Sequence, residues 1–130
     1  MSFKRLLHVL RVVVAWLILP ALAVVIWGEL KPADQFEIHV WDKLLHFTAY
    51  FGLSLMATIA TRANWRAVSC ALMLIILGGT LEIVQGMVGR DCDIWDEVAN
   101  TIGVVTGLAA GWAGIAFLRA RKLVEARPPD

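Results

Sequence analysis

Residues 98–118 read VANTIGVVTGLAAGWAGIAFL, and none of these 21 residues carries a charge. An α-helix rises about 1.5 Å per residue, so a run of about 17–25 apolar residues crosses a hydrocarbon core of about 30 Å. The run falls inside that range. This stretch therefore predicts a transmembrane helix.

Three similar runs precede it along the chain. No charged residue occurs from 12 to 28 or from 44 to 61, and Glu82 is the only one between 67 and 89. We expect one all-α membrane domain over residues 1–130, because four long apolar runs joined by short connections are typical of a helical membrane protein. Pro20 is expected to bend the first helix. The predicted transmembrane helices are at about 12–28, 44–61, 67–89 and 96–118.

The composition argues against a soluble globular enzyme. Apolar residues make up 59% of the 130 residues, charged residues only 18%, and the mean hydropathy is +0.71. Soluble domains reach only about 45–50% apolar with glycine included and carry about 25% charged residues. Disorder is excluded on the same grounds. The two cysteines are too few for a disulfide framework and lack the spacing of a zinc site.

The lysines and arginines predict the orientation of the four helices. Nine of the twelve fall on one side: Lys4, Arg5, Arg11, Arg62, Arg66, Arg119, Arg121, Lys122 and Arg127. By the positive-inside rule this side is cytoplasmic, so both termini are expected inside the cell. Cys70 then lies near the cytoplasmic start of the third helix and Cys92 beyond its outer end, about 30 Å away, which is too far for a disulfide.

The N-terminal run has a second interpretation. Lys4 and Arg5, the apolar stretch and the small residues at 21–23 resemble a secretory signal with a cleavage site. The apolar run continues through residues 24–27, however, which favours a retained helix. Cleavage would leave three helices with the same outer face.

Polar side chains gather at the predicted outer ends of the last three helices. They are Asp42, Lys43, His46 and Tyr50 on the second, Glu82 and Gln85 on the third, Arg90 in the following loop, and Asp96 and Asn100 on the fourth. Spacings of three or four residues place Asp42 with His46, and Asp96 with Asn100, on one helix face. Polar groups in membrane spans are costly, so we expect them to converge into one outward-facing pocket.

Glycines on the fourth helix indicate how such a pocket forms. Gly103, Gly107 and Gly111 recur every four residues and follow Asn100 on the same face. Small residues at this spacing let helices approach closely. We expect this stripe to pack the fourth helix against its neighbours, with Gly78 and Gly79 doing the same on the third.

At this point the sequence resembles a known family. The motif Asp42-Lys43-x-x-His46-Phe47, followed by Glu82-x-x-Gln85-x4-Arg90-x5-Asp96-x3-Asn100-x-x-Gly103, is similar to the signature of the VanZ-like family. These are small bacterial membrane proteins related to a teicoplanin-resistance accessory protein. The resemblance spans residues 42 to about 107 and implies a multi-pass protein of the bacterial plasma membrane, linked to glycopeptide resistance. The resemblance does not imply a particular biochemical activity for the chain.

Three classes of function stay open. The favoured one is a cell-envelope protein whose pocket binds a lipid-linked or amphipathic ligand. The first alternative is a membrane enzyme using acid/base or metal-assisted chemistry on an envelope lipid precursor. The second is a structural or accessory protein, acting alone or as a homo-oligomer. A transporter is less attractive, since four short helices leave little room for alternating access.

The candidate residues take different roles in these classes. Glu82 and Asp96 are candidate catalytic acid/base groups, with His46 as proton partner. The candidate ligand-binding residues are Asp42, Lys43, Gln85, Arg90 and Asn100, with Arg90 as an anion contact. The oxygens of Glu82 and Asp96 would also suit a divalent cation such as Mg²⁺. No other cofactor is predicted. The predicted partners are membrane lipids or a lipid-linked ligand, with further copies of the chain as an alternative, and not nucleic acid.

Each candidate also has a purely structural interpretation. His46 could hydrogen-bond Asp42 at a helix start, and Glu82 could pair with Arg90 or share a proton with Asp96. Gln85 and Asn100 suit interhelical hydrogen bonds. The acids at 91 and 93 are expected on a solvated loop.

Overall fold

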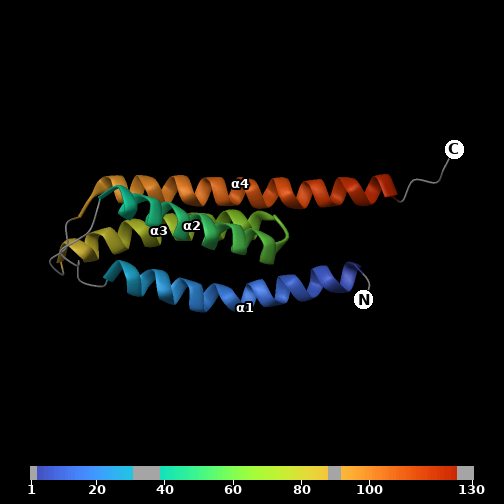
Figure 1. Ribbon diagram of the computed structural model, residues 1–130, viewed down its shortest axis with the longest axis horizontal. Helices are drawn as coiled ribbons and strands as arrows, with labels where there is room; N and C mark the ends of the chain where they lie inside the picture. The colour runs from blue at the N-terminus through green and yellow to red at the C-terminus, as the bar shows by residue number, and fades with distance from the viewer. Residues whose placement is uncertain (1–2, 31–38, 88–91, 126–130) are drawn as a thin grey trace.

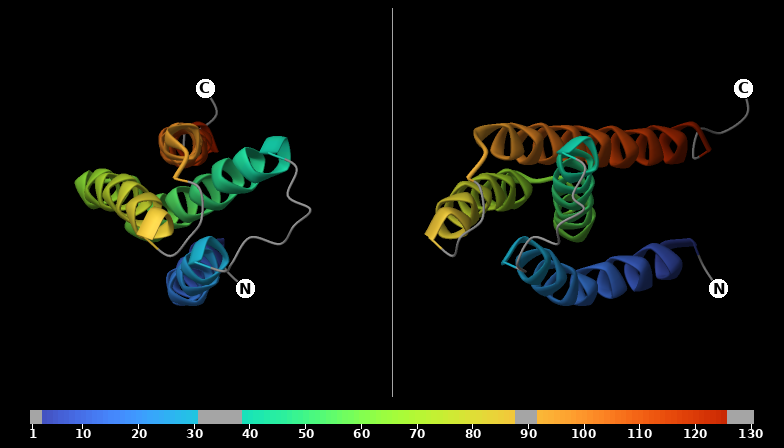
Figure 2. Two further views of the ribbon diagram at one scale, coloured as in Figure 1. Left: turned by 90° about the vertical axis from the view of Figure 1, so that its left-hand side faces the viewer. Right: turned by 60° about the vertical axis from the view of Figure 1, so that its left-hand side comes forward.

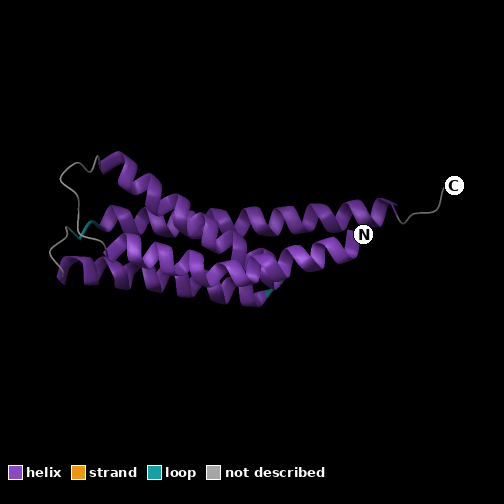
Figure 3. Ribbon diagram, turned by 60° about the horizontal axis from the view of Figure 1, so that its bottom comes forward, coloured by secondary structure: helices purple, strands orange, loops and turns teal. Residues whose placement is uncertain are grey.

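The computed structural model describes residues 3–30, 39–87 and 92–125, and every regular element in these ranges is an α-helix (Figures 1 and 3). The four helices are α1 (Phe3–Leu30), α2 (His39–Thr61), α3 (Trp65–Met87) and α4 (Ile94–Glu125). Each contains a stretch long and apolar enough to cross a membrane: Arg5–Leu30, Asp42–Thr61, Trp65–Met87 and Ile94–Arg121. The prediction of an all-α fold with four such helices is confirmed.

The first and last helices extend beyond the predicted spans. α1 begins at Phe3 rather than near residue 12, and α4 continues to Glu125 rather than ending near residue 118. Basic residues such as Arg11 and Arg119 interrupt the apolar runs without ending the helices. Their long side chains can reach from a helix end toward the membrane surface. A basic residue therefore ends the apolar run in the sequence while the helix continues past it.

α1 and α4 run along the long axis on opposite sides of the molecule, and α2 and α3 lie between them (Figures 1 and 2). The C-terminal ends of α1 and α3 meet the N-terminal ends of α2 and α4 at one end of the bundle, at the left of Figure 1. We call this end the cluster end, after the polar side chains described below. The opposite end, where α1 begins and α4 ends, is called the terminal end. No Cα atoms of α1 and α4 approach within 8 Å in the described part of the chain. α1 continues through Pro20 and is visibly bowed, as expected (Figure 1).

Glycines bring α2 and α4 into close contact. A Cβ atom on Gly103 would overlap the carbonyl oxygen of Phe47, and one on Gly107 would overlap that of Phe51. Gly111 meets a threonine side chain of α2 in the same way. The predicted packing role of this stripe is therefore confirmed, because only a residue without a side chain allows the two backbones to come so close.

The bundle is apolar outside and partly polar inside. Large side chains such as Trp16, Met73 and Ile76 are exposed on its surface, as expected for residues that face lipid. Between the helices, Ser54 is buried and its hydroxyl donates to the carbonyl oxygen of Val104 at 2.8 Å. Lipid provides no hydrophobic drive for helix association, so close packing and such hydrogen bonds hold α2 against α4.

A tight turn joins α2 to α3 at the terminal end. Arg62 and Ala63 have positive φ angles of 62° and 51°, and the Ala63 amide donates to the carbonyl oxygen of Thr58 at 3.0 Å. Left-handed residues of this kind commonly end helices because they satisfy the last carbonyl groups. The side chain of Asn64 then accepts from the Arg66 amide at 2.9 Å and caps the start of α3.

Candidate functional site

All four helices contribute polar side chains at the cluster end. This polar cluster consists of Glu29 from α1, Asp42, Lys43, His46 and Tyr50 from α2, Glu82 and Gln85 from α3, Asp93 just before α4, and Asp96, Glu97 and Asn100 from α4. Most of these residues are buried, although several are ionisable. Burying polar groups costs free energy unless they are paired, so the contacts within the cluster decide whether it is stable.

Lys43 links α2 to the start of α4. Its Nζ donates to Oδ2 of Asp93 at 2.6 Å and to Oδ1 of Asp96 at 2.9 Å. The Lys43 and Asp93 side chains are each 35% exposed, whereas that of Asp96 is only 6% exposed. Lys43 therefore lies at the rim, as predicted, and its charge compensates a carboxylate that lies deeper.

Asp93 has a more specific role than the solvated loop position expected from the sequence. It lies just before α4 with its side chain 35% exposed, forms an ion pair with Lys43, and caps α4 by accepting from the Trp95 amide at 2.9 Å. An aspartate directly before a helix, with Asp96 three residues later, is a recognisable helix-start signal that would have placed it there. Asp91 lies outside the described residues.

His46 occupies the centre of the cluster. Its Nδ1 lies 3.0 Å from Oδ1 of Asn100 and 3.8 Å from Oε1 of Glu29, and its Nε2 lies 3.8 Å from Oδ1 of Asp42. An amide oxygen can only accept, so Nδ1 donates to Asn100. His46 is thus hydrogen-bonded to the fourth helix rather than to Asp42 on its own helix, and two carboxylates flank its ring.

Glu82 is a buried carboxylate facing the interior of the bundle. The residue is 4% exposed, and neither carboxylate oxygen has a hydrogen-bond partner among the described residues. The ionisable side chains close enough to interact with it electrostatically are Asp96, His46 and Glu29. Glu82 thus lies within electrostatic range of His46 and Asp96. Arg90, the predicted partner of Glu82 and anion contact, lies outside the described residues.

Gln85 and Asn100 are both fully enclosed. Asn100 accepts from His46 and donates through Nδ2 to Oε2 of Glu97 at 3.3 Å, so it bridges two members of the cluster. Nε2 of Gln85 is buried without a hydrogen-bond partner among the described residues. Gly78 makes room for this arrangement on α3, because a Cβ atom there would lie 2.5 Å from Oε2 of Glu97.

Four members of the cluster are absent from the predicted site residues: Glu29, Tyr50, Asp93 and Glu97. Glu29 is buried at the end of α1, Glu97 accepts from both Asn100 and Thr101, and Tyr50 is completely buried. The sequence placed Tyr50 among the converging polar side chains but assigned it no role. Glu29 follows an apolar run as a boundary charge does, and its position 3.8 Å from His46 became evident only in the structure.

The charges of the described cluster are unbalanced. Six carboxyl groups stand against one lysine and one histidine; the acids are Glu29, Asp42, Glu82, Asp93, Asp96 and Glu97. Lys43 pairs with two of the acids but carries only one positive charge. An excess of buried acids favours a proton or a bound cation in the cluster.

One group of side chains has the geometry of a cation site. Ligand atoms of Asp42, His46 and Asp96 all lie within 4.8 Å of one another. The group contains Asp96, as the sequence suggested for a divalent cation, but the other two members differ from the suggested Glu82. Two carboxylates and an imidazole suit Mn²⁺ or Zn²⁺ better than Mg²⁺, which prefers oxygen ligands alone.

Comparison with known protein families supports the resemblance seen in the motif. The model of the family described as VanZ/LLP1 matches residues 4–117. No curated protein and no solved structure shows significant similarity to the chain.

Proposed function

The chain belongs to the VanZ/LLP1 family, and from this premise we propose that its polar cluster is a binding pocket for the head group of a lipid-linked or amphipathic ligand of the cell envelope. The chain is a multi-pass membrane protein. A pocket inside such a bundle can be reached by a ligand whose apolar part stays in the bilayer. The proposal therefore concerns ligands with a membrane-embedded tail.

The observation that carries the proposal is the buried carboxylate of Glu82, which accepts no side-chain hydrogen bond from the described residues and lies among unbalanced acids. A cluster that served only to fix helix register would be most stable with every polar group satisfied. Here Glu82 and part of Gln85 lack partners in the described chain, although Lys43, His46 and Asn100 are well paired. We infer that the ligand supplies the missing partner and that it carries a positive charge or a bound cation there.

The test compares Glu82→Gln with Glu125→Gln, a matched change at the far end of α4. Glu82→Gln keeps the shape but removes the ionisable acid. It is expected to weaken ligand binding about tenfold or more, as the loss of one charge-assisted contact predicts. Membrane abundance and melting temperature should stay unchanged or rise. The readout is the teicoplanin susceptibility of cells expressing each variant; the lipid profile of the same cells separates a binder from the enzyme considered below.

The link to glycopeptides belongs to the same proposal. Expression of the wild-type chain is expected to reduce teicoplanin susceptibility, and Glu82→Gln to reverse that reduction while Glu125→Gln does not. If Glu82→Gln and Asp96→Asn both lose membrane abundance, the cluster is structural and the proposal is wrong. If both are abundant and both behave as wild type in lipid profile and susceptibility, the pocket has no ligand.

An enzyme is the second candidate, favoured by the group formed by Asp42, His46 and Asp96. A divalent cation bound there could polarise a phosphate of a lipid-linked precursor, and Glu82 could act as a base nearby. This alternative predicts that a new lipid product accumulates with the wild-type chain and that His46→Ala abolishes it. A passive binder leaves the set of products unchanged.

We also propose that the cluster end faces outward and that both termini are cytoplasmic, following the distribution of basic residues. Cys92 is exposed at the cluster end, and Cys70 lies within α3 toward the other end. A membrane-impermeant maleimide is therefore expected to label Cys92 in intact spheroplasts, with Cys92→Ser as the control that removes the signal. Labelling that requires permeabilised cells would reverse the orientation.

A further inference from the structure

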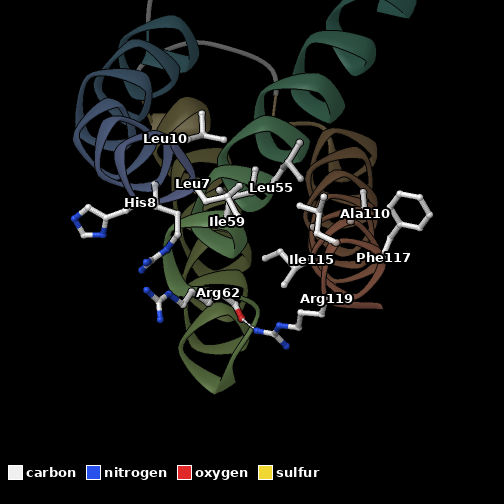
Figure 4. A pocket seen from close by; sticks show the side chains of 14 residues that line it. Leu7, His8, Leu10, Leu55, Ile59, Arg62, Ala110, Ile115, Phe117 and Arg119 are labelled. Carbon is white, nitrogen blue, oxygen red and sulfur yellow. Dashed lines mark hydrogen bonds between the residues drawn. The ribbon is translucent and has the colours of Figure 1, made fainter. Parts of the chain in front are cut away.

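A cavity lies at the terminal end, far from the polar cluster. It has a volume of about 730 Å³, within the range of roughly 300–1,000 Å³ of small-molecule pockets. α2 forms its floor, and α1 and α4, whose Cα atoms stay more than 8 Å apart in the described residues, form its walls. The apolar lining includes Leu7 and Leu10 of α1, Leu55 and Ile59 of α2, and Ile115 of α4 (Figure 4).

Three arginines surround one side of this cavity. Arg11, Arg62 and Arg119 come from three different helices or helix ends, and no aspartate or glutamate is among the described residues that line the cavity. Figure 4 shows Arg62 and Arg119 together at one edge, with Leu55 and Ile59 further in. Arg11 and Arg62 are close enough for their like charges to interact. The edge is therefore strongly cationic while the interior is apolar.

Helix capping explains part of this arrangement. Nη2 of Arg11 donates to the carbonyl oxygen of Ala60 at 3.0 Å, and Nη2 of Arg119 donates to that of Arg62 at 2.9 Å. Both bonds satisfy carbonyl groups at the C-terminal end of α2. Each guanidinium has five N–H donors, so most remain available, and Nε of Arg11 is buried without a hydrogen-bond partner among the described residues. Helix capping therefore explains neither the arginine N–H groups that remain available nor the presence of the cavity.

We propose that this cavity binds one anionic phospholipid of the adjoining leaflet, with an acyl chain among the leucine and isoleucine side chains and the phosphate at Arg11, Arg62 and Arg119. Guanidinium groups present their donors in a fork that matches phosphate oxygens. A zwitterionic phospholipid would place its own cation beside three arginines with no lining carboxylate to balance it. Charge complementarity therefore selects a head group of net negative charge, and an acyl chain matches the apolar interior. This site is independent of the function proposed for the polar cluster.

Two substitutions test the two halves of the site separately. Arg62→Gln removes one charge without touching either capping bond made by an arginine side chain, and Arg66→Gln is its matched control at the start of α3, outside the cavity lining. Gly114→Leu fills the apolar part, because Gly114 lines the cavity and has open space around it. Melting without added lipid verifies that each variant is folded.

The experiment measures the melting temperature of the purified full chain in mild detergent with added phosphatidylglycerol, phosphatidylethanolamine or inorganic phosphate. Phosphatidylglycerol should raise the melting temperature, phosphatidylethanolamine much less, and inorganic phosphate not at all. Arg62→Gln and Gly114→Leu should each increase the half-saturating phosphatidylglycerol concentration about tenfold, and Arg66→Gln should not. Equal stabilisation by both lipids, the same shift with inorganic phosphate, or equal behaviour of all three variants would overturn the proposal.

Discussion

Replacing Gly107 with alanine is expected to destabilise the protein by about 1–3 kcal/mol, and the double variant Gly103→Ala/Gly107→Ala by more. The added methyl group at either position would overlap a backbone carbonyl oxygen of α2. A backbone atom cannot rotate away as a side chain can, so α2 and α4 must separate. That separation also weakens the contact between His46 and Asn100, because both lie across the same helix pair.

Gly114→Ala is the matched control on the same helix. No atom lies within 4 Å of a Cβ at this position, so alanine there meets no obstacle and gains up to about 1 kcal/mol in helix propensity. Thermal melting in detergent and membrane abundance check both results. Equal melting temperatures for Gly107→Ala and Gly114→Ala would show that the close approach of α2 and α4 is not what stabilises the bundle.

Lys43→Met is expected to destabilise the protein by about 1–2 kcal/mol. It removes the only lysine of the cluster in the described chain and leaves the nearly buried carboxylate of Asp96 without its counter-charge. The estimate stays below that for a fully buried pair because the Lys43 side chain is 35% exposed and therefore partly screened by solvent. Asp93 loses its partner too, but its exposure lets water replace the ion pair.

A double-mutant cycle separates this ion pair from simple loss of packing. Adding Asp96→Asn to Lys43→Met removes the stranded charge and is expected to restore part of the lost free energy of unfolding. Arg66→Met is the control, an exposed basic residue expected to change that free energy by less than about 0.5 kcal/mol. Strictly additive effects of Lys43→Met and Asp96→Asn in melting experiments would contradict the proposed coupling.

The sequence predicted the helices well because charge-free runs of sufficient length have few other structural solutions. It located helix ends less well: α1 includes Arg5 and Arg11, and α4 includes Arg119, although all three interrupt apolar runs. Hydropathy indicates where an apolar segment ends. The backbone hydrogen bonds of the helix continue past that residue, so hydropathy alone does not locate the end of the helix.

The site was predicted in outline for a similar reason. Position along a helix gives depth in the membrane, so His46, Glu82 and Asp96 could be placed at one level. The depth of a residue in the membrane does not determine which side chain it faces across the bundle. The pairing of Lys43 with Asp93 and the contact of Glu29 with His46 depend on how closely the helices pack and at what angle, which is a property of the assembled chain.

The hydrogen bonds of the cluster have a consequence for biogenesis. Lys43 and His46 bond to side chains 50 to 54 residues further along the chain, in α4 and directly before it. These bonds can form only after α4 has been synthesised, so the polar contacts of α2 with this part of the chain are completed late in biogenesis.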